Sequence, residues 1–248
     1  MPTEKTFHFL HQSGNPLVLY NIWDAGSAEA VARAGAKALA TGSASVAGAL
    51  GYPDGEAVPL DTLLHVVARI RAVSDLPLSV DFEAGYGETP GEIADNAARL
   101  EDLGVAGINL EDGIPPESGI RPAAEHAERI AAIRARTALF INARTDLFLQ
   151  NPPDTHAALL PEAHERAAIY AEAGADGFFA PGLTEPALIR DLCENCSLPV
   201  NIMASPAAPS IAELAGLKVA RVSFGPFPWR DAMASLAQAA SEQLGQRA

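Results

Sequence analysis

The stretch that decides the fold of this chain is LEDLGVAGINLED, residues 100–112. It reads as the end of an amphipathic helix, a glycine stop and a short apolar strand that runs into two acids. A glycine takes the left-handed conformation that ends a helix and lets the chain turn tightly into the strand. The same unit recurs at residues 31–41, 169–180 and 211–222. The repetition predicts helices and strands that alternate along the chain.

Further apolar runs bring the predicted strands to eight, at residues 17–21, 38–41, 78–81, 107–110, 140–143, 177–179, 200–203 and 221–223. Eight strands that alternate with helices over 248 residues predict a (β/α)8 TIM barrel. An open doubly wound sheet is the alternative, but the turn after the first strand, residues 23–27, lacks the glycine-rich phosphate-binding pattern. Because the sequence contains no linker, we expect one domain over residues 1–248, with a C-terminal helical segment at about 229–248.

The composition argues against several kinds of partner. There are 31 Asp and Glu residues against 17 Lys and Arg, so the formal charge is −14. Such an acidic surface repels phosphate backbones and anionic lipids, and we predict neither a nucleic-acid nor a membrane partner. No apolar stretch reaches the ~18–20 residues of a membrane helix, and residues 1–12 lack a signal pattern, so we expect a cytoplasmic protein.

Cysteines and lysines narrow the chemistry further. The only cysteines are Cys193 and Cys196, with no cluster of histidines to complete a zinc site, and we expect inert, reduced thiols. The three lysines are Lys5, Lys37 and Lys218, and the last two precede strands, at the end of a barrel away from its active site. A Schiff-base aldolase or a pyridoxal-phosphate enzyme needs a lysine inside the site, so the lysine positions disfavour both.

Acids gather where the predicted strands end. Asp81 and Glu83 follow the third strand, Glu111 follows the fourth, and Asp54 lies in the loop after the second. The carboxyl ends of barrel strands share one face, so these oxygens can form a site for Mg²⁺ or Mn²⁺. The alternative is that each acid caps a helix or pairs with a surface cation. We predict a metal site made of Asp54, Asp81, Glu83 and Glu111.

An arginine follows the fifth predicted strand. Arg144 lies in the segment Asn-Ala-Arg-Thr-Asp, residues 142–146. A guanidinium at this position can hold a substrate carboxylate through two parallel hydrogen bonds. The alternative is an internal ion pair with Asp146 or Glu111.

Polar groups at two other strand ends suit a small anionic substrate. Thr41, Gly42 and Ser43 offer hydroxyl and backbone N–H groups after the second strand. A helix cap or a turn is the alternative for this segment. Asn201 lies at the tip of the seventh strand, where we expect it to hydrogen-bond the substrate.

Six segments, taken in order, carry a resemblance to a known family. They are residues 21–27, 41–47, 50–56, 80–87, 108–113 and 141–146. With these segments the chain resembles the isocitrate lyase/phosphoenolpyruvate mutase superfamily over essentially its whole length. The resemblance implies a Mg²⁺-dependent (β/α)8 barrel that acts on 2-oxo or 2-hydroxy carboxylates through an enolate-like species.

The resemblance also implies roles for individual residues. Asp81 is implied to be the principal metal ligand. The resemblance implies that Asp54, Glu83 and Glu111 hold the water ligands of the metal. The substrate is implied to be held by Gly42, Ser43 and Arg144. The family exchanges its last helix between subunits, so residues 231–244 are expected to help form a homo-oligomer, a dimer or a tetramer.

The loop after the fourth strand departs from the lyases of this family, which carry Lys-Lys-Cys-Gly-His there. In this chain residues 114–120 read IPPESGI, with neither cysteine nor histidine. The proton donor is therefore open, with Tyr86 and Glu117 as candidates, and we predict Arg144, Glu111 and Tyr86 as catalytic residues.

Three functions follow from these patterns. The leading hypothesis is a Mg²⁺-dependent carbon–carbon lyase or decarboxylase of a small 2-oxo or 2-hydroxy carboxylate. One alternative is phosphonate chemistry, either a mutase that rearranges phosphoenolpyruvate to phosphonopyruvate or a hydrolase that breaks the P–C bond of phosphonopyruvate. Another is a barrel that binds metal and carboxylate without catalysis.

Overall fold

The computed structural model describes residues 7–245 and contains eight parallel strands. They are β1 (Leu17–Leu19), β2 (Leu39–Ala40), β3 (Leu78–Asp81), β4 (Gly107–Glu111), β5 (Phe140–Arg144), β6 (Gly177–Phe179), β7 (Val200–Met203) and β8 (Arg221–Ser223). The strands pair in the order β1-β8-β7-β6-β5-β4-β3-β2. Beyond β1 and β2, a parallel bridge between Ile22 and Thr41 nearly closes the sheet into a barrel. The predicted (β/α)8 fold is confirmed, with a strand at each of the eight predicted positions.

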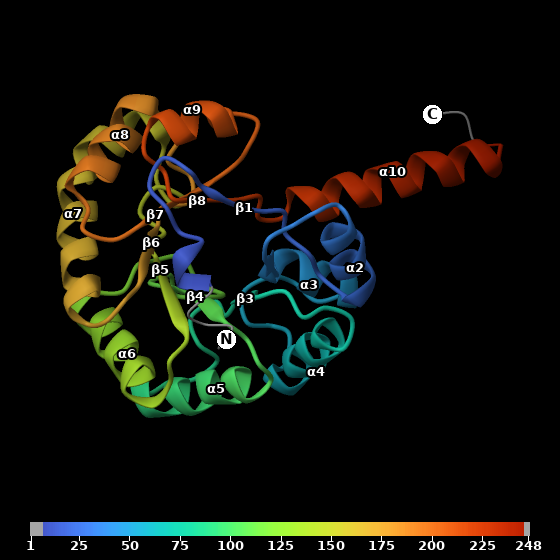
Figure 1. Ribbon diagram of the computed structural model, residues 1–248, viewed down its shortest axis with the longest axis horizontal. Coiled ribbons are helices and arrows are strands. Elements are labelled where there is room, and N and C mark those ends of the chain that lie inside the picture. Colours follow the sequence, from blue (N-terminus) through green and yellow to red (C-terminus); the bar gives the residue numbers. More distant parts are fainter. Residues whose placement is uncertain (1–6, 246–248) are drawn as a thin grey trace.

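Helices separate the strands and cover the outside of the barrel (Figure 1). They are α2 (Ala25–Arg33), α3 (Ser43–Leu50), α4 (Leu60–Arg71), α5 (Pro90–Asp102), α6 (Ala123–Arg136), the 3-10 helix η1 (Pro153–Thr155), α7 (His156–Glu172), α8 (Pro186–Asn195), α9 (Ile211–Gly216) and α10 (Phe227–Gln243). Local sequence explains where several begin. Before α5, the Thr89 hydroxyl accepts a hydrogen bond from the Glu92 backbone N–H, and the Glu92 carboxylate accepts one from that of Thr89. This reciprocal cap satisfies N–H groups that have no partner inside the helix.

Apolar packing between the sheet and the helices holds the barrel together. Val80, Ile108 and Ile141, on three adjacent strands, are fully buried in one cluster with Ile93 of α5 and Ile130 of α6. Because successive strand residues point to opposite faces, the residues between these apolar ones point into the barrel.

The interior of the barrel is polar toward one end and apolar toward the other. Ser79, Asn109 and Asn142 are buried polar residues that alternate with the apolar residues of β3, β4 and β5. At the end where the strands begin, Phe7 packs edge-on against Phe140, with 5.4 Å between ring centroids. This aromatic pair fills the barrel at the amino ends of the strands, and the polar part of the interior faces their carboxyl ends.

The predicted glycine stops hold in most, but not all, of the repeated units. Gly104 and Gly174 follow α5 and α7 with φ values of 77° and 102°, in the left-handed region. After α9 the left-handed residue is Lys218, with a φ of 67°, and Gly216 is the last residue of the helix. The expectation that glycine makes every such turn is wrong for this unit, which bears the steric cost of a side chain at positive φ.

The last helix leaves the barrel. Figure 1 shows α10 extending away from the other elements, toward the C-terminus. Its first turn is anchored by Trp229, which lies so close to Gly48 of α3 that a Cβ on Gly48 would meet the indole ring at 2.7 Å. Exchange of this helix between subunits stays a prediction, and residues 246–248 of the expected segment lie outside the described residues. Between residues 7 and 245, no helix is long and apolar enough to cross a membrane.

Candidate active site

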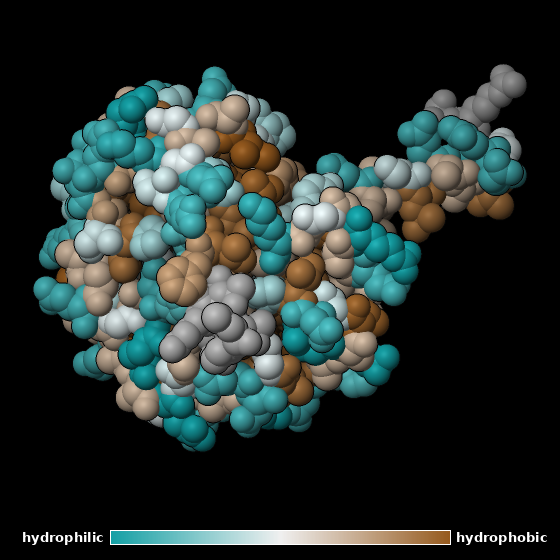
Figure 2. All heavy atoms as spheres, viewed as in Figure 1, coloured by the Kyte–Doolittle hydropathy of each residue, from teal (hydrophilic) through white to brown (hydrophobic). Residues whose placement is uncertain are grey.

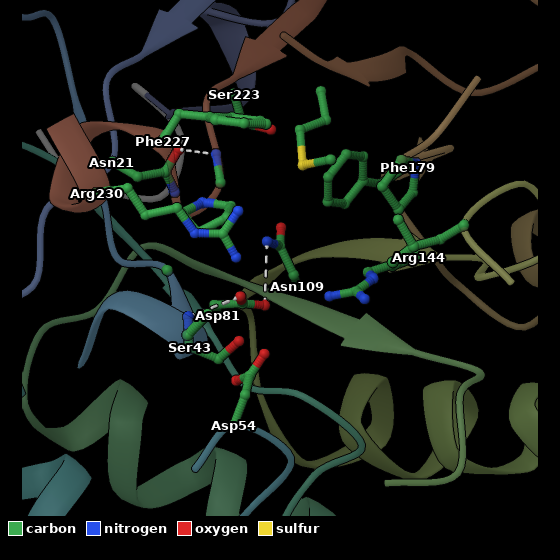
Figure 3. Close-up of a pocket in the computed structure, with 17 residues that line it drawn as sticks. Asn21, Ser43, Asp54, Asp81, Asn109, Arg144, Phe179, Ser223, Phe227 and Arg230 are labelled. Atoms are coloured by element: carbon green, nitrogen blue, oxygen red, sulfur yellow. Dashed lines mark hydrogen bonds between the residues drawn. The ribbon is translucent and has the colours of Figure 1, made fainter. Parts of the chain in front are cut away.

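A cavity of about 340 Å³ opens at the carboxyl ends of the strands, where the sequence predicts the site (Figure 3). Its polar lining consists of Asn21, Gly42, Ser43, Asp54, Asp81, Asn109, Ser223, Arg144 and Arg230. Its apolar lining includes Ala44, Leu149, Phe179, Pro181, Met203, Pro226 and Phe227. The volume is at the small end of the ~300–1,000 Å³ of small-molecule pockets.

Asp81 lies at the centre of this lining, at the end of β3. The Ser43 backbone N–H donates a 3.0 Å hydrogen bond to its Oδ2, and the Asn109 side-chain amide donates a 3.4 Å one to its Oδ1. The Asp81 backbone N–H donates a hydrogen bond of 2.9 Å to the Thr41 hydroxyl. Thr41 is 1% exposed and does not line the cavity, so the structure gives it a positioning contact to Asp81. The other two predicted substrate contacts on this segment, Gly42 and Ser43, do line the cavity.

Beneath the cavity lies a buried arginine that sequence reasoning did not identify. Arg221 of β8 is 1% exposed and donates to the Ser79 hydroxyl at 3.3 Å and to the Asn109 amide oxygen at 3.1 Å. The Asn142 amide donates to the same oxygen at 2.9 Å. These contacts fix the Asn109 amide so that its nitrogen faces Asp81. Burial lowers the pKa of Arg221 to about 9, and the carboxylate of Asp81 opposes that shift.

A smaller cavity of about 210 Å³ continues from the first on its acidic side. The two cavities share Ser43, Asp54 and Arg144. The smaller one is also lined by Glu83, Glu111, Glu117 and Asp146. All four predicted metal-site acids, Asp54, Asp81, Glu83 and Glu111, therefore face one continuous space, although they come from different loops and strands.

Burial disfavours the charged forms of three of these acids and raises their pKa values. Burial raises the pKa of Glu83 to about 7, and Asp81 adds to this shift. Burial and Asp81 also raise the pKa of Asp54. For Glu111, burial raises the pKa while the charge of Arg144 opposes the change. The carboxylates thus outnumber the cations that balance them.

Arg144 is engaged by two carboxylates. Its Nη1 lies 2.8 Å from Oε2 of Glu111, and its Nε lies 2.6 Å from Oδ1 of Asp146. Burial lowers the pKa of Arg144, but these two carboxylates outweigh burial and raise the pKa above its ordinary value. The internal ion pair that the sequence left open is therefore present, and Arg144 also lines both cavities.

The loop after β3 has a strained backbone that presents Glu83. Glu83 and Tyr86 have φ values of 50° and 56°, and Gly85 has a φ of 108°. A Cβ on Gly85 would lie 2.5 Å from the Ile93 side chain, so this position requires glycine. Tyr86 lies outside the two cavities described above, on a third one, and its hydroxyl donates to Glu83. The catalytic role predicted for Tyr86 stays a prediction, and in this geometry its contact to the acidic cavity runs through Glu83.

Two asparagines change the predicted lining of the cavity. Asn201 is fully buried, accepts a 3.4 Å hydrogen bond from the Ser223 hydroxyl and does not line the cavity. Asn21, which we predicted no role for, does line it. Its amide donates to the Thr41 carbonyl at 2.8 Å and accepts from the backbone N–H groups of Phe224 and Gly225 at 2.8 and 2.9 Å. Asn21 thereby joins the loops after β1, β2 and β8.

The predicted metal site contains no ready-made chelate. Within residues 7–245, no group of three or more His, Cys, Asp and Glu side chains is arranged to hold a metal ion directly. The two cysteines are both free, and burial raises the pKa of Cys193 to about 12, which keeps it a thiol at neutral pH. The geometry is compatible with one direct carboxylate contact and water-mediated contacts to the rest, which is how proteins commonly hold Mg²⁺.

Comparison with known proteins assigns the chain to a family. The sequence profile of phosphoenolpyruvate phosphomutase matches residues 7–244. The chain belongs to this family. Relatives of the chain are enzymes, among them 2-methylisocitrate lyase and oxaloacetate decarboxylase. The resemblance that the six sequence segments carry is confirmed.

Individual relatives cover most of the chain. A solved structure from Burkholderia cenocepacia J2315, provisionally described as a phosphonomutase, is 47% identical, with a TM-score of 0.93 and 98% of each chain covered. The 2-methylisocitrate lyase of Escherichia coli K12 is 32% identical over 205 residues, which are 79% of this chain and 68% of the lyase. Phosphonopyruvate hydrolase, solved with oxalate and Mg²⁺, is 22% identical, with a TM-score of 0.86 over 99% of this chain and 88% of the hydrolase. At 22% identity the hydrolase shows the fold alone.

Proposed function

We propose that this protein is a divalent-metal-dependent lyase or decarboxylase that breaks a carbon–carbon bond in a small 2-oxo or 2-hydroxy carboxylate. The observation that carries the proposal is the convergence of Asp54, Asp81, Glu83 and Glu111 on one cavity at the carboxyl ends of the strands. The family relationship to enzymes such as 2-methylisocitrate lyase supports it.

The buried acids fit a divalent cation. Burial raises the pKa values of Asp54, Glu83 and Glu111, and Arg144, the cation among them, is already paired. A Mg²⁺ or Mn²⁺ ion would supply the missing positive charge and stabilise negative charge that develops on a substrate oxygen. In this proposal Asp81 contacts the ion, and Asp54, Glu83 and Glu111 hold its water ligands.

The start of α3 suits the carboxylate of the substrate. Gly42 lacks a side chain to cap the helix, and Gly42, Ser43 and Ala44 all line the cavity. The first N–H groups of a helix have no partners inside it and attract anions. The N–H of Ser43 already donates to Asp81, so in this proposal the substrate carboxylate lies beside Asp81 at the start of the helix. Arg144 borders the same cavity from β5, paired with Glu111 and Asp146, and in this proposal the donors that these two carboxylates leave free bind the substrate.

Glu117 is the better candidate for a proton donor or acceptor. It lines the acidic cavity from the loop after β4, whereas Tyr86 lies outside that cavity. The loop is held in place by Gln150, which accepts a 2.9 Å hydrogen bond from the Gly119 N–H and donates one of 3.1 Å to the Gly119 carbonyl. We infer that Glu117 exchanges the proton at the reacting carbon of the substrate.

Chemistry at a P–C bond is the second candidate, favoured by the 47% identity to the Burkholderia structure. Incubation with phosphonopyruvate or phosphoenolpyruvate, followed by phosphorus NMR, distinguishes it from carbon–carbon cleavage. A barrel that binds metal and carboxylate without turnover would show binding but no product in either assay.

The test is a calorimetric titration with oxalate, a stable mimic of enolpyruvate, with and without Mg²⁺. Wild type and Asp81→Ala are compared, and Asp102→Asn, which removes an exposed acid from α5, is the matched control. We expect Mg²⁺-dependent binding by the wild type and the control, and none by Asp81→Ala. Equal binding by Asp81→Ala, or no binding by the wild type, would refute the proposed site.

A further inference from the structure

The third cavity, on which Tyr86 lies, contains two arginines that the candidate active site does not use. It has a volume of about 620 Å³ and is lined by the segment between α3 and α4 and by the loops after β3 and β4. Arg121, from the loop after β4, and Arg129, from α6, both line it. Neither arginine lines the two cavities of the candidate active site, and none of the four proposed metal-site acids lines the third cavity.

No carboxylate pairs directly with either arginine among the described residues. The Nε of Arg121 is buried and has no hydrogen-bond partner within residues 7–245. Arg129 is 8% exposed and donates to the backbone carbonyls of Ala84 at 3.1 Å and Glu88 at 3.4 Å. A guanidinium has five N–H donors, so both side chains keep donors for a ligand.

Neighbouring groups respond to this concentration of positive charge. Burial lowers the pKa of Arg129, and the charge of Arg121 lowers it further, while Glu56 and Glu125 oppose the shift. Burial, followed by the charges of Arg129 and Arg121, also lowers the pKa of the buried His126 to about 3. The cavity is therefore a local positive region in a chain whose formal charge is −14.

Two carboxylates line the same cavity, Glu56 and Glu88. Oε1 of Glu56 accepts a 2.7 Å hydrogen bond from the Tyr86 backbone N–H, which holds this carboxylate on the loop after β3. Glu88 is exposed, so water can solvate its charge. Neither carboxylate occupies the free donors of the arginines, and an anion from solution can reach them.

We propose that Arg121 and Arg129 form a binding site for the phosphate group of a small phosphorylated metabolite. The site lies outside the cavities of the proposed function and does not depend on it. Two guanidinium groups balance the charge of a phosphate group, about −1.5 to −2 at neutral pH, and each can bind two of its oxygens. The cavity has room for the rest of such a molecule beside Val58, Pro59 and Leu60.

The test is a calorimetric titration of the full chain with inorganic phosphate, without Mg²⁺ and at constant ionic strength. We expect one phosphate to bind to wild type, and Arg121→Gln to bind it about 10- to 100-fold more weakly. Arg129→Lys should give an intermediate affinity, because lysine keeps the charge and loses the planar fork. Acetate carries a single charge and should bind to wild type at least about tenfold more weakly than phosphate.

Two controls separate this site from other effects of charge. Arg69→Gln removes an exposed arginine from α4 and should change the phosphate affinity less than about twofold. Arg230 lines the main cavity, so Arg230→Gln tests whether phosphate binds there, and we expect its affinity to equal that of wild type. Circular dichroism checks that each variant is folded.

Three results would overturn the proposal. Wild type could show no saturable phosphate binding, or Arg121→Gln could bind phosphate as tightly as wild type. A loss of affinity in Arg230→Gln, with none in Arg121→Gln, would place the anion in the main cavity. Acetate binding as tight as that of phosphate would mean that the site does not select a phosphate group.

Discussion

The Tyr86 hydroxyl donates a hydrogen bond of 2.7 Å to Oε1 of Glu83. The Glu56 backbone N–H donates one of 2.7 Å to the other carboxylate oxygen. Glu83 is 5% exposed, so these two donors replace the water that would otherwise stabilise its charge. Tyr86 therefore positions and stabilises a proposed metal-site acid, from a location outside the main cavity.

Tyr86→Phe is expected to reduce the unfolding free energy by about 1.5 kcal/mol, the value for losing a hydrogen bond to a charged group. We expect kcat at saturating Mg²⁺ to fall less than about tenfold, because the hydroxyl acts through Glu83. A proton donor would show a much larger loss, of about 10²- to 10⁴-fold. Steady-state kinetics at several Mg²⁺ concentrations distinguish these results, and a loss in the larger range would make Tyr86 the donor.

Removal of the Arg144 guanidinium is expected to be costly. Arg144→Met leaves the buried carboxylates of Glu111 and Asp146 without their cation, and breaking such a buried pair costs about 3–5 kcal/mol. Urea unfolding measures the loss. Arg136→Ala, which breaks an exposed pair with Asp95, is the control and should cost less than about 1 kcal/mol. Equal losses for the two variants would contradict a buried ion-pair network.

A buried histidine is expected to make the protein less stable in acid. His126 is fully buried, and burial, followed by the charges of Arg129 and Arg121, lowers its pKa to about 3. Below the unfolded pKa of about 6.5, the unfolded chain binds a proton that the folded protein excludes, so stability falls as the pH falls toward 3. Between pH 7.5 and pH 5 this one group is expected to cost about 2 kcal/mol.

His126→Phe removes this proton and keeps an aromatic ring edge-on to Tyr170, where the histidine ring lies at 4.8 Å. Urea unfolding at pH 7.5 and pH 5 is expected to show a smaller loss of stability for the variant than for wild type, by about 2 kcal/mol. His65→Phe, at an exposed position of α4, should lose as much as wild type. An unchanged loss in His126→Phe would mean that the histidine is protonated in the folded state.

The projecting helix is expected to bind a second copy of the chain. Leu236 and Leu244 of this C-terminal segment are 63% and 75% exposed, and Figure 2 shows hydrophobic atoms along its length. Val18 and Tyr20, at β1, also expose apolar surface. An isolated protein rarely leaves such a helix uncovered, and a second copy can cover both surfaces.

Light scattering after size-exclusion chromatography is expected to give a dimer or tetramer for wild type and a smaller assembly for Leu236→Glu. Gln238→Glu adds the same charge two residues away, at an exposed position of α10, and should keep the wild-type assembly. A monomeric wild type would contradict the prediction.

Much of the barrel could be predicted because its signals are local. Strands and turns depend on residues that are close together in sequence. Examples are the apolar runs of residues 78–81 and 107–110 and the glycines that precede strands. The positions of Asp81 and Glu111 followed from the same pattern, because parallel strands in a barrel bring their carboxyl ends to one face.

Tertiary structure alone decided which of these groups have partners. Arg144 had two interpretations in the sequence, and only the packing of β4 beside β5 brought Glu111 within 2.8 Å of it. Arg230 is 149 residues from Asp81 in sequence, and the folded start of α10 places both on one cavity. Sequence periodicity determines which face of an element is buried. The partners of a charged side chain depend on which distant segments lie within a few ångströms of it, and closure of the barrel decides this.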